Sequence, residues 1–237
     1  MTAYIGRGLA TGLLAGLLAG LFALLFAEPT IDRAIALEGH GHNEGSHAAS
    51  LHEEPFGRGA QKAGLVLATS LYGAACGLFF GLLYSRLRGE ARGGEWRRSL
   101  ALACALFFGA VVVPFLKYPP NPPGAAADPS TLGERTLAYL AAVALSLLAV
   151  LAARRFARAL GDAPVAARDL AFGGVLLLLW SFLLLALPDF GASGGSIPPD
   201  LLWDFRLSSL GTQAVLWAGI GCLFGLLAER ARRGGTP

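Results

Sequence analysis

Six long apolar runs, none of which contains a charged residue, constrain the fold of this chain more than any other feature of its sequence. The first extends from Gly8 to Ala27, and its twenty residues, at about 1.5 Å each in a helix, match the roughly 30 Å hydrocarbon core of a bilayer. The other runs are Ala63–Tyr84, Leu100–Phe115, Leu137–Leu151, Leu170–Leu187 and Leu210–Ala228. Charged residues make up only 15% of the chain, well below the roughly 25% usual in soluble domains. We therefore expect an all-α integral membrane protein, a single membrane domain over residues 1–237 with a bundle of about six transmembrane helices.

Two of these assignments have alternatives. The runs that begin at Leu100 and Leu137 are short for a span, so five helices are the alternative to six. A cleaved signal peptide is the alternative to a first membrane-spanning helix. The first run exceeds the roughly 7–15 residues of a signal core, and Phe26-Ala27-Glu28-Pro29 is a poor cleavage site, so a retained helix is favoured.

Glycines spaced four apart predict close helix packing at Gly12, Gly16, Gly20, Gly73, Gly77, Gly81, Gly221 and Gly225.

The segments that join the runs alternate in their content of basic residues. Thirteen of the nineteen lie before the first run, after the sixth, or in the second and fourth connections. Because Lys and Arg concentrate on the cytoplasmic side of a membrane, we expect both termini in the cytoplasm. The segments expected outside are a His- and Glu-rich loop at 28–62, a Pro-rich loop at 116–136, and a loop with a short interfacial helix at 188–209.

All four histidines of the chain lie within thirteen positions of the first outward loop. Glutamates accompany them, and imidazole together with carboxylate oxygen suits divalent ions of the cobalt, nickel, copper and zinc group. An extended backbone would place His40 and His42 on the same side, and the neighbouring glycines would let the loop fold around an ion. The alternative is a solvated loop whose histidines bind nothing. The candidate metal ligands are His40, His42, His47, His52, Glu44, Glu53 and Glu54.

The other two outward loops carry prolines, aromatic residues and a few charges. Lys117 and Tyr118 fit an anchor at headgroup level, and Asp204 could pair with Arg206 across the short interfacial helix. For the Pro-rich loop, a rigid connector is the alternative to a functional role. Polar residues inside a span usually face the bundle or a wet cavity. The candidates for an outer vestibule or a path are Thr69, Ser70, Lys117, Tyr118, Asn121, Asp200, Asp204, Arg206, Thr212 and Gln213.

The motifs of these loops resemble those of a known family. The Pro-x-Leu-Lys-Tyr-Pro-x-Asn-Pro-Pro run at 114–123, followed by Gly-x-Arg-Thr at 133–136, is similar to the family of predicted cobalt transporter subunits of the CbtA type. So are Pro-x-Asp-Leu-Leu-Trp-x-Phe-Arg at 198–206 and Ser-Leu-Gly-Thr-Gln at 209–213. The resemblance covers essentially the whole chain. It implies a multi-pass protein of the bacterial cytoplasmic (inner) membrane that moves cobalt for cobalamin synthesis, together with a small single-span, histidine-bearing partner subunit.

No motif indicates an enzyme. The sequence has neither a Gly-x4-Gly-Lys-Ser/Thr phosphate loop nor a His-Glu-x-x-His pair, and no apolar run contains a histidine or a carboxylate. The membrane potential, at about 2.3 kcal/mol per charge per 100 mV, is then the expected driving force for a divalent ion. The leading hypothesis is uptake of divalent cobalt as substrate, captured by the histidine loop, with no organic cofactor and no nucleic acid partner. Alternatives are a non-transporting scaffold or assembly factor in the bilayer, an importer of nickel, and a carrier of an organic solute. A homo-oligomer is left open.

Overall fold

A computed structural model of the chain describes residues 1–41, 57–87, 94–123, 129–190 and 197–234. Over these ranges the chain is helical and contains no strand. Six helical segments are long and apolar enough to cross a membrane, which confirms the all-α fold with six spans instead of five. They are α1 (Thr2–Phe26), α3 (Arg58–Leu87), a third span made of α4 (Glu95–Phe107), the π-helical turn η2 (Phe108–Val112) and α5 (Val113–Lys117), α6 (Leu132–Ala159), α7 (Val165–Ala186) and α8 (Pro199–Arg233). The shorter α2 (Glu28–Gly41) and the 3-10 turn η3 (Pro129–Thr131) complete the described elements.

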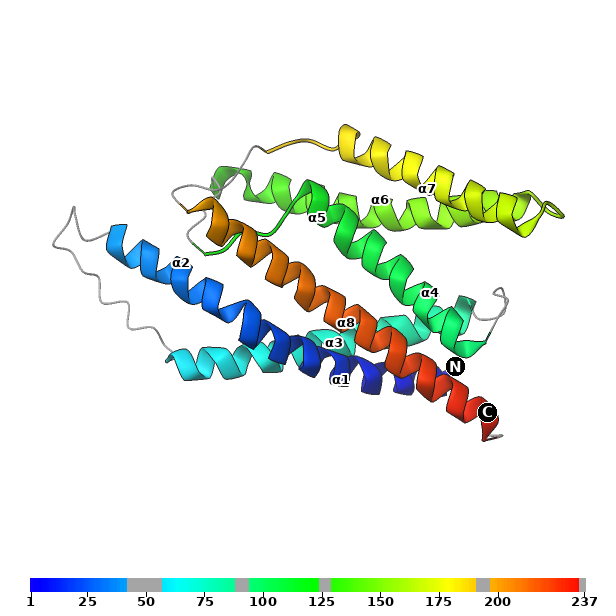
Figure 1. The fold of residues 1–237 in the computed structure, drawn as a ribbon, viewed down its shortest axis with the longest axis horizontal. Coiled ribbons are helices and arrows are strands. Elements are labelled where there is room, and N and C mark those ends of the chain that lie inside the picture. Colours follow the sequence, from blue (N-terminus) through cyan, green and yellow to red (C-terminus); the bar gives the residue numbers. More distant parts are fainter. Residues whose placement is uncertain (42–56, 88–93, 124–128, 191–196, 235–237) are drawn as a thin grey trace. The chain divides into compact units, whose positions relative to one another are not determined.

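The internal contacts divide the chain into two compact units. Unit 1 comprises Met1–Cys104, Asn121–Ala125 and Gly194–Pro237, and therefore contains α1, α2, α3, most of α4 and α8. Unit 2 comprises Ala105–Pro120 and Ala126–Ser193, with η2, α5, α6 and α7. In unit 1, α1 lies alongside both α3 and α8, and α2 follows α1 (Figure 1). The two units are each internally packed, and the single membrane domain expected from the sequence stays a prediction.

Glycine spacing brings the backbones of α1 and α3 into direct contact. A Cβ built on Gly16 would lie 2.5 Å from the Thr69 carbonyl oxygen, and one built on Gly12 would lie 2.7 Å from the Gly77 Cα. Cβ atoms do not approach backbone atoms this closely, so these positions admit only glycine. Gly8, Gly73 and Gly81 approach the facing backbone in the same way. The close packing predicted from the four-residue spacing is confirmed for this helix pair.

Aromatic rings fill the end of unit 1 where α1 starts and α8 finishes, here called the terminal end. The ring of Phe224 on α8 lies 5.1 Å from that of Phe80 and 4.8 Å from that of Tyr84 on α3, and Tyr4 of α1 lies 5.8 Å from Tyr84. The Tyr84 hydroxyl donates to the carboxylate of Glu95, the first residue of α4. Glu95 is only 5% exposed. The chain therefore begins and ends on one side of unit 1, as an even number of spans requires.

In unit 2, the third span contains its π-helical turn directly before Pro114. In this register an amide donates to the carbonyl five residues earlier. Pro114 has no N–H, so the Gly109 carbonyl lacks its backbone donor. The hydroxyl of Ser146 on α6 donates to that carbonyl instead, and Trp180 Nε1 on α7 donates to the Ser146 carbonyl at 3.2 Å. One serine therefore joins three helical segments of unit 2.

Several helices extend beyond the apolar runs that predicted them. The short interfacial helix expected around Trp203 is the first part of a continuous 35-residue helix, because α8 begins at Pro199. Residues 28–41, expected to belong to the first outward loop, form α2. An apolar run marks the part of a helix that lies in the hydrocarbon core of the bilayer. The helix can continue beyond it into water, because its backbone hydrogen bonds are formed within the helix. Pro29 is the second residue of α2 and Pro199 is the first of α8, and in the first turn of a helix the missing N–H has no helical partner to lose.

Candidate functional site

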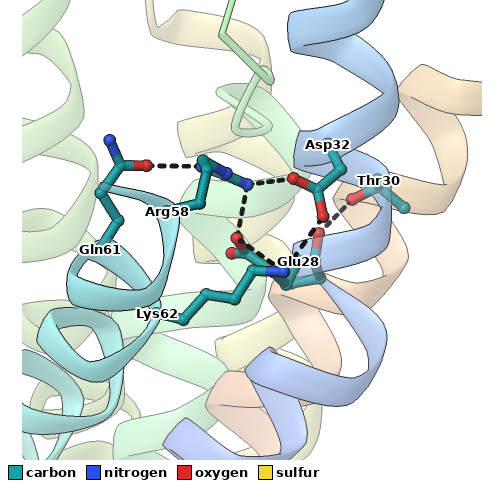
Figure 2. A network of polar contacts seen from close by, with 7 residues as sticks. Glu28, Thr30, Asp32, Arg58, Gln61 and Lys62 are labelled. Atoms are coloured by element: carbon teal, nitrogen blue, oxygen red, sulfur yellow. Dashed lines mark hydrogen bonds and ion pairs between the residues drawn. The ribbon is translucent and has the colours of Figure 1, made fainter. Parts of the chain in front are cut away.

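The end of unit 1 opposite the terminal end, here called the distal end, holds a cluster of four charges. Glu28 and Asp32 lie one turn apart on α2, and Arg58 and Lys62 lie one turn apart on α3 (Figure 2). Arg58 Nη2 is 2.6 Å from Glu28 Oε1 and also donates to Asp32 Oδ1. Lys62 Nζ is 3.4 Å from Asp32 Oδ2 and 4.0 Å from Glu28 Oε1. The cluster joins the start of α2 to the start of α3, so it ties together the two ends of the chain segment that carries the histidines.

The two carboxylates of this cluster differ in burial. The side chain of Glu28 is 8% exposed and that of Asp32 is 46% exposed. Burial of a carboxylate is unfavourable unless it is paired and hydrogen-bonded, so Glu28 requires the Arg58 guanidinium. The hydrogen bond from Arg58 holds the pKa of Asp32 below its usual value against the opposing effect of burial, and Lys62 adds to the lowering. Asp32 therefore stays ionised to lower pH than a free aspartate.

A hydrogen bond joins residues from the two outward loop motifs. Arg206 on α8 donates through Nη2 to Asn121 Oδ1 at 2.8 Å, and both residues belong to unit 1. Asp204 is exposed. Positions two apart on a helix do not face each other, so a continuous α8 does not favour the pair expected between Asp204 and Arg206. The structure instead brings Arg206 together with Asn121, which lies 85 positions earlier in the sequence.

A shallow groove of about 420 Å³ opens between α2 and the start of α8. Its walls are largely apolar, with one cationic and one anionic side chain. The lining residues are Arg33, Ala36, Leu37, Pro198, Asp200 and Leu201. The predicted vestibule residue Asp200 therefore borders a recess at the distal end.

Lys117 and Tyr118, also predicted for the vestibule, belong to unit 2. Lys117 Nζ lies 3.9 Å from Asp189 Oδ2, and the Tyr118 hydroxyl donates to the carbonyl of residue 188 at 2.8 Å. Arg135 on α6 donates to the carbonyl of residue 190 at 3.1 Å. Burial raises the pKa of Tyr118, and the negative charge of Asp189 adds to the effect. These contacts hold the segment that follows α7 against α5 and α6.

The polar side chains inside the spans that are candidates for a path differ in whether they have a hydrogen-bond partner. Thr69, Ser70 and Thr212 each donate the hydroxyl to a carbonyl of their own helix four residues earlier, at 2.7 to 2.9 Å. Thr69 and Ser70 also pack against the glycines of α1. Gln213 differs, because its Oε1 is buried without a hydrogen-bond partner among the described residues. The structure therefore distinguishes Gln213 from the other three candidates.

The predicted metal ligands fall mostly on residues that the structure does not describe. His40 lies in the last turn of α2, so its backbone is helical and not extended as expected. Within the described ranges, no group of three or more His, Cys, Asp or Glu side chains could hold a metal ion. Metal capture by this segment stays a prediction. The remaining ligands, which lie outside the described residues, are His42, His47, His52, Glu44, Glu53 and Glu54.

Two buried carboxylates and one buried indole nitrogen were not among the residues predicted for the site. Counted over the whole residue, Glu28 at the distal end of unit 1 is 6% exposed, and Glu95 at the terminal end is 5% exposed. Each is the first residue of a helix, where a negative charge interacts favourably with the helix dipole. That position is visible in the sequence, but the burial is not. Trp217 lies within the sixth apolar run, and its Nε1 is buried without a partner among the described residues.

Among the described residues, six helical segments are apolar enough to span a membrane, and ion pairs lie near the ends of these helices. This arrangement defines a multi-pass integral membrane protein. The family model described as "Probable cobalt transporter subunit (CbtA)" matches residues 1–229, nearly the whole chain. The chain belongs to this family, which confirms the resemblance drawn from the loop motifs. No curated protein and no solved structure matches the chain.

Proposed function

We propose that this chain is the membrane subunit through which divalent cobalt enters a bacterial cell across the inner membrane, to supply cobalamin synthesis. The observation that carries the proposal is the match of the cobalt transporter subunit family over residues 1–229. Six apolar spans provide the membrane passage that this role needs. The distribution of basic residues supports cytoplasmic termini, and the distal end would then face the solution from which the ion arrives.

In this proposal the segment between α2 and α3 captures the ion. Imidazole and carboxylate groups suit cobalt, and several such ligands on one segment raise the local concentration of bound ion. The ligands are His40, His42, His47 and His52, with Glu44, Glu53 and Glu54. Because α2 and α3 begin at the four-charge cluster, an ion released from this segment reaches the distal end of unit 1 first.

At the distal end, Asp200, Asp204, Asn121 and Arg206 would form the vestibule. The exposed carboxylates of Asp200 and Asp204 attract a cation, and the bond between Arg206 and Asn121 fixes the loop beside them. Lys117 and Tyr118 would anchor unit 2 at the membrane surface. The negative interior drives the divalent ion inward. A small single-span, histidine-bearing subunit would assist delivery of the ion.

Replacement of all four histidines by alanine tests the capture step. We expect cobalt uptake to fall at low external cobalt and to recover at high cobalt, because capture limits the rate only when the ion is scarce. A control chain with Asn43, Ser46 and Ser50 replaced by alanine keeps the ligands and should behave as the wild type. Uptake that is unchanged at every concentration would remove the histidine segment from the mechanism.

The competing role is a membrane scaffold or assembly factor that moves no ion. Purified chain in sealed vesicles, with and without the single-span partner, separates the two. Chain-dependent entry of cobalt supports the transporter, whereas no entry in either preparation supports the scaffold. Competition by excess nickel in the same vesicles decides which ion the chain prefers.

A further inference from the structure

Two polar atoms on consecutive turns of α8 are buried without hydrogen-bond partners among the described residues. They are the amide oxygen Oε1 of Gln213, an acceptor, and the indole nitrogen Nε1 of Trp217, a donor. Trp217 is only 6% exposed. Residues four apart lie on the same face of a helix, so the two side chains leave α8 on the same face.

Packing against α1 gives the depth of this pair. A Cβ built on Gly211 would lie 2.9 Å from the ring of Phe22, and one built on Gly219 would lie 2.8 Å from the Cβ of Ala15. Ala15 is close to the centre of α1 (Thr2–Phe26), and Phe22 is one turn from its distal end. Gln213 and Trp217 fall between these two levels, so both lie inside the span and not at its rim.

A polar atom inside the hydrocarbon region needs a partner, because lipid offers none. The neighbouring Thr212 meets this need with a carbonyl of its own helix, and Trp180 in unit 2 meets it with the Ser146 carbonyl. A water molecule both donates and accepts, so one water can accept from Trp217 Nε1 and donate to Gln213 Oε1. Buried waters in proteins typically bridge polar groups that have no other partner.

We infer that Gln213 and Trp217 form a water-binding site inside the sixth span of this chain. The inference about water stands by itself, and its consequence for transport rests on the proposed function. A divalent ion loses less hydration energy where the wall of its route holds water, and the Gln213 oxygen can accept a hydrogen bond from water that the ion carries. The site would therefore be a hydrated step on the route of the ion.

Exchange of indole N–H groups with deuterium tests the water directly. The chain is labelled with ¹⁵N-tryptophan in lipid nanodiscs, and the signals of Trp217 and Trp180 are assigned through Trp217→Phe and Trp180→Phe. Trp180 is the internal control, because its N–H is bonded to protein and exchanges only when the structure opens. Trp217 is more buried than Trp180, so burial alone predicts slower exchange at Trp217. Bound water that exchanges with solvent predicts the opposite, with Trp217 about tenfold or more faster than Trp180.

Gln213→Leu provides the second comparison, since leucine has nearly the same size and no acceptor. We expect this variant to slow exchange at Trp217 to the rate of Trp180 while the other indole signals stay in place. Exchange at Trp217 that is no faster than at Trp180 in the wild type, or that is unaffected by Gln213→Leu, would overturn the water site. If Gln213→Leu does not fold, the wild-type comparison alone decides.

Cobalt uptake by Gln213→Leu tests the consequence separately. A severalfold loss of uptake, with fast exchange at Trp217 in the wild type, supports a hydrated step on the ion route. Unchanged uptake would overturn the link to transport and leave the water site standing. Failure of the wild type to take up cobalt would contradict the proposed function and would not alter the exchange result.

Discussion

Arg206 of α8 donates a hydrogen bond of 2.8 Å to Asn121, so residues from two outward loop motifs, 85 positions apart in sequence, meet at the distal end of unit 1. Hydrogen bonds to charged groups stabilise proteins by about 1.5–3 kcal/mol. This bond therefore fixes the position of the short stretch around Asn121 relative to α8.

Asn121→Ala is expected to lower the free energy of unfolding by about 1–3 kcal/mol, because it leaves the half-buried guanidinium without this acceptor. Arg206→Ala should have a similar effect, and the double variant should lose less than the sum of the two. Denaturation in mixed micelles measures all three. Asp204→Ala, on the same helix but exposed, should change stability by less than about 0.5 kcal/mol. Strictly additive losses would show that the two side chains do not interact.

The ion pair between Glu28 and Arg58 gives a second prediction. Among the described residues, Arg58→Gln leaves the buried Glu28 carboxylate with Lys62, 4.0 Å away, as its remaining cation, and should destabilise the chain by about 1–3 kcal/mol. Adding Glu28→Gln to Arg58→Gln removes the uncompensated charge and should recover part of the loss. Thermal unfolding of the three variants in detergent measures this. A double variant less stable than Arg58→Gln would contradict the assigned pairing.

Asp32 makes stability depend on pH in a definite direction. Its pKa is lowered in the folded chain, chiefly by the hydrogen bond from Arg58. A lowered carboxyl pKa stabilises the folded state at pH values above the unfolded pKa of about 3.9, and the effect is lost as the pH falls through the folded pKa. We expect Asp32→Asn to show a smaller loss of melting temperature than the wild type on acidification below about pH 5. Equal losses in the two chains would show that Asp32 does not contribute.

The contact between α1 and α3 is tested with two glycines of one helix. A Cβ on Gly77 would lie 2.6 Å from the Gly12 Cα, so Gly77→Ala must separate the two helices. Overpacking of this kind lowers stability by about 1–3 kcal/mol. Gly64, also on α3, has nothing within 4 Å of a built Cβ, so Gly64→Ala should be neutral or stabilising by up to about 1 kcal/mol. Equal effects of the two substitutions would contradict the packing described for α1 and α3.

Ser146 is predicted to stabilise unit 2 through the π-helical turn. Ser146→Ala leaves the Gly109 carbonyl without a donor, because Pro114 cannot supply one, and should lower stability by about 1–2 kcal/mol. Ser85→Ala is the matched control, since the Ser85 hydroxyl donates within its own helix, to the Leu82 carbonyl at 2.7 Å. Amide exchange around residues 108–113 should increase in Ser146→Ala alone. An unchanged exchange pattern there would show that another group satisfies the carbonyl.

The fold could be predicted because the bilayer imposes a simple rule on the sequence. Uncharged runs such as Gly8–Ala27 and Ala63–Tyr84 can only be stable in lipid as helices, and the four-residue glycine spacing gives the α1–α3 contact. The ends of the helices could not be predicted from hydropathy. Hydropathy does not mark α2 as a span. The residues that predict a short helix around Trp203 do not show that it is continuous with the sixth apolar run.

The contacts around the candidate site could be predicted less well than the fold, because they join distant parts of the chain. Lys117, Tyr118, Asn121 and Arg206 were selected from the loop motifs, but their partners are set by tertiary packing. Asp204 was the expected partner of Arg206 because the two are close in sequence, whereas the helical geometry of α8 turns them to different sides. Burial of Glu28 by the surrounding helices likewise leaves no local trace in the sequence.

The most direct test of the proposed function is uptake of radioactive cobalt by cells that lack other cobalt importers, with and without this chain and with and without the proposed single-span partner. The proposal predicts chain-dependent uptake that excess unlabelled cobalt suppresses and excess nickel does not. Uptake that needs the partner as well would make this chain one component of the transporter. No chain-dependent uptake in either background would contradict the proposal.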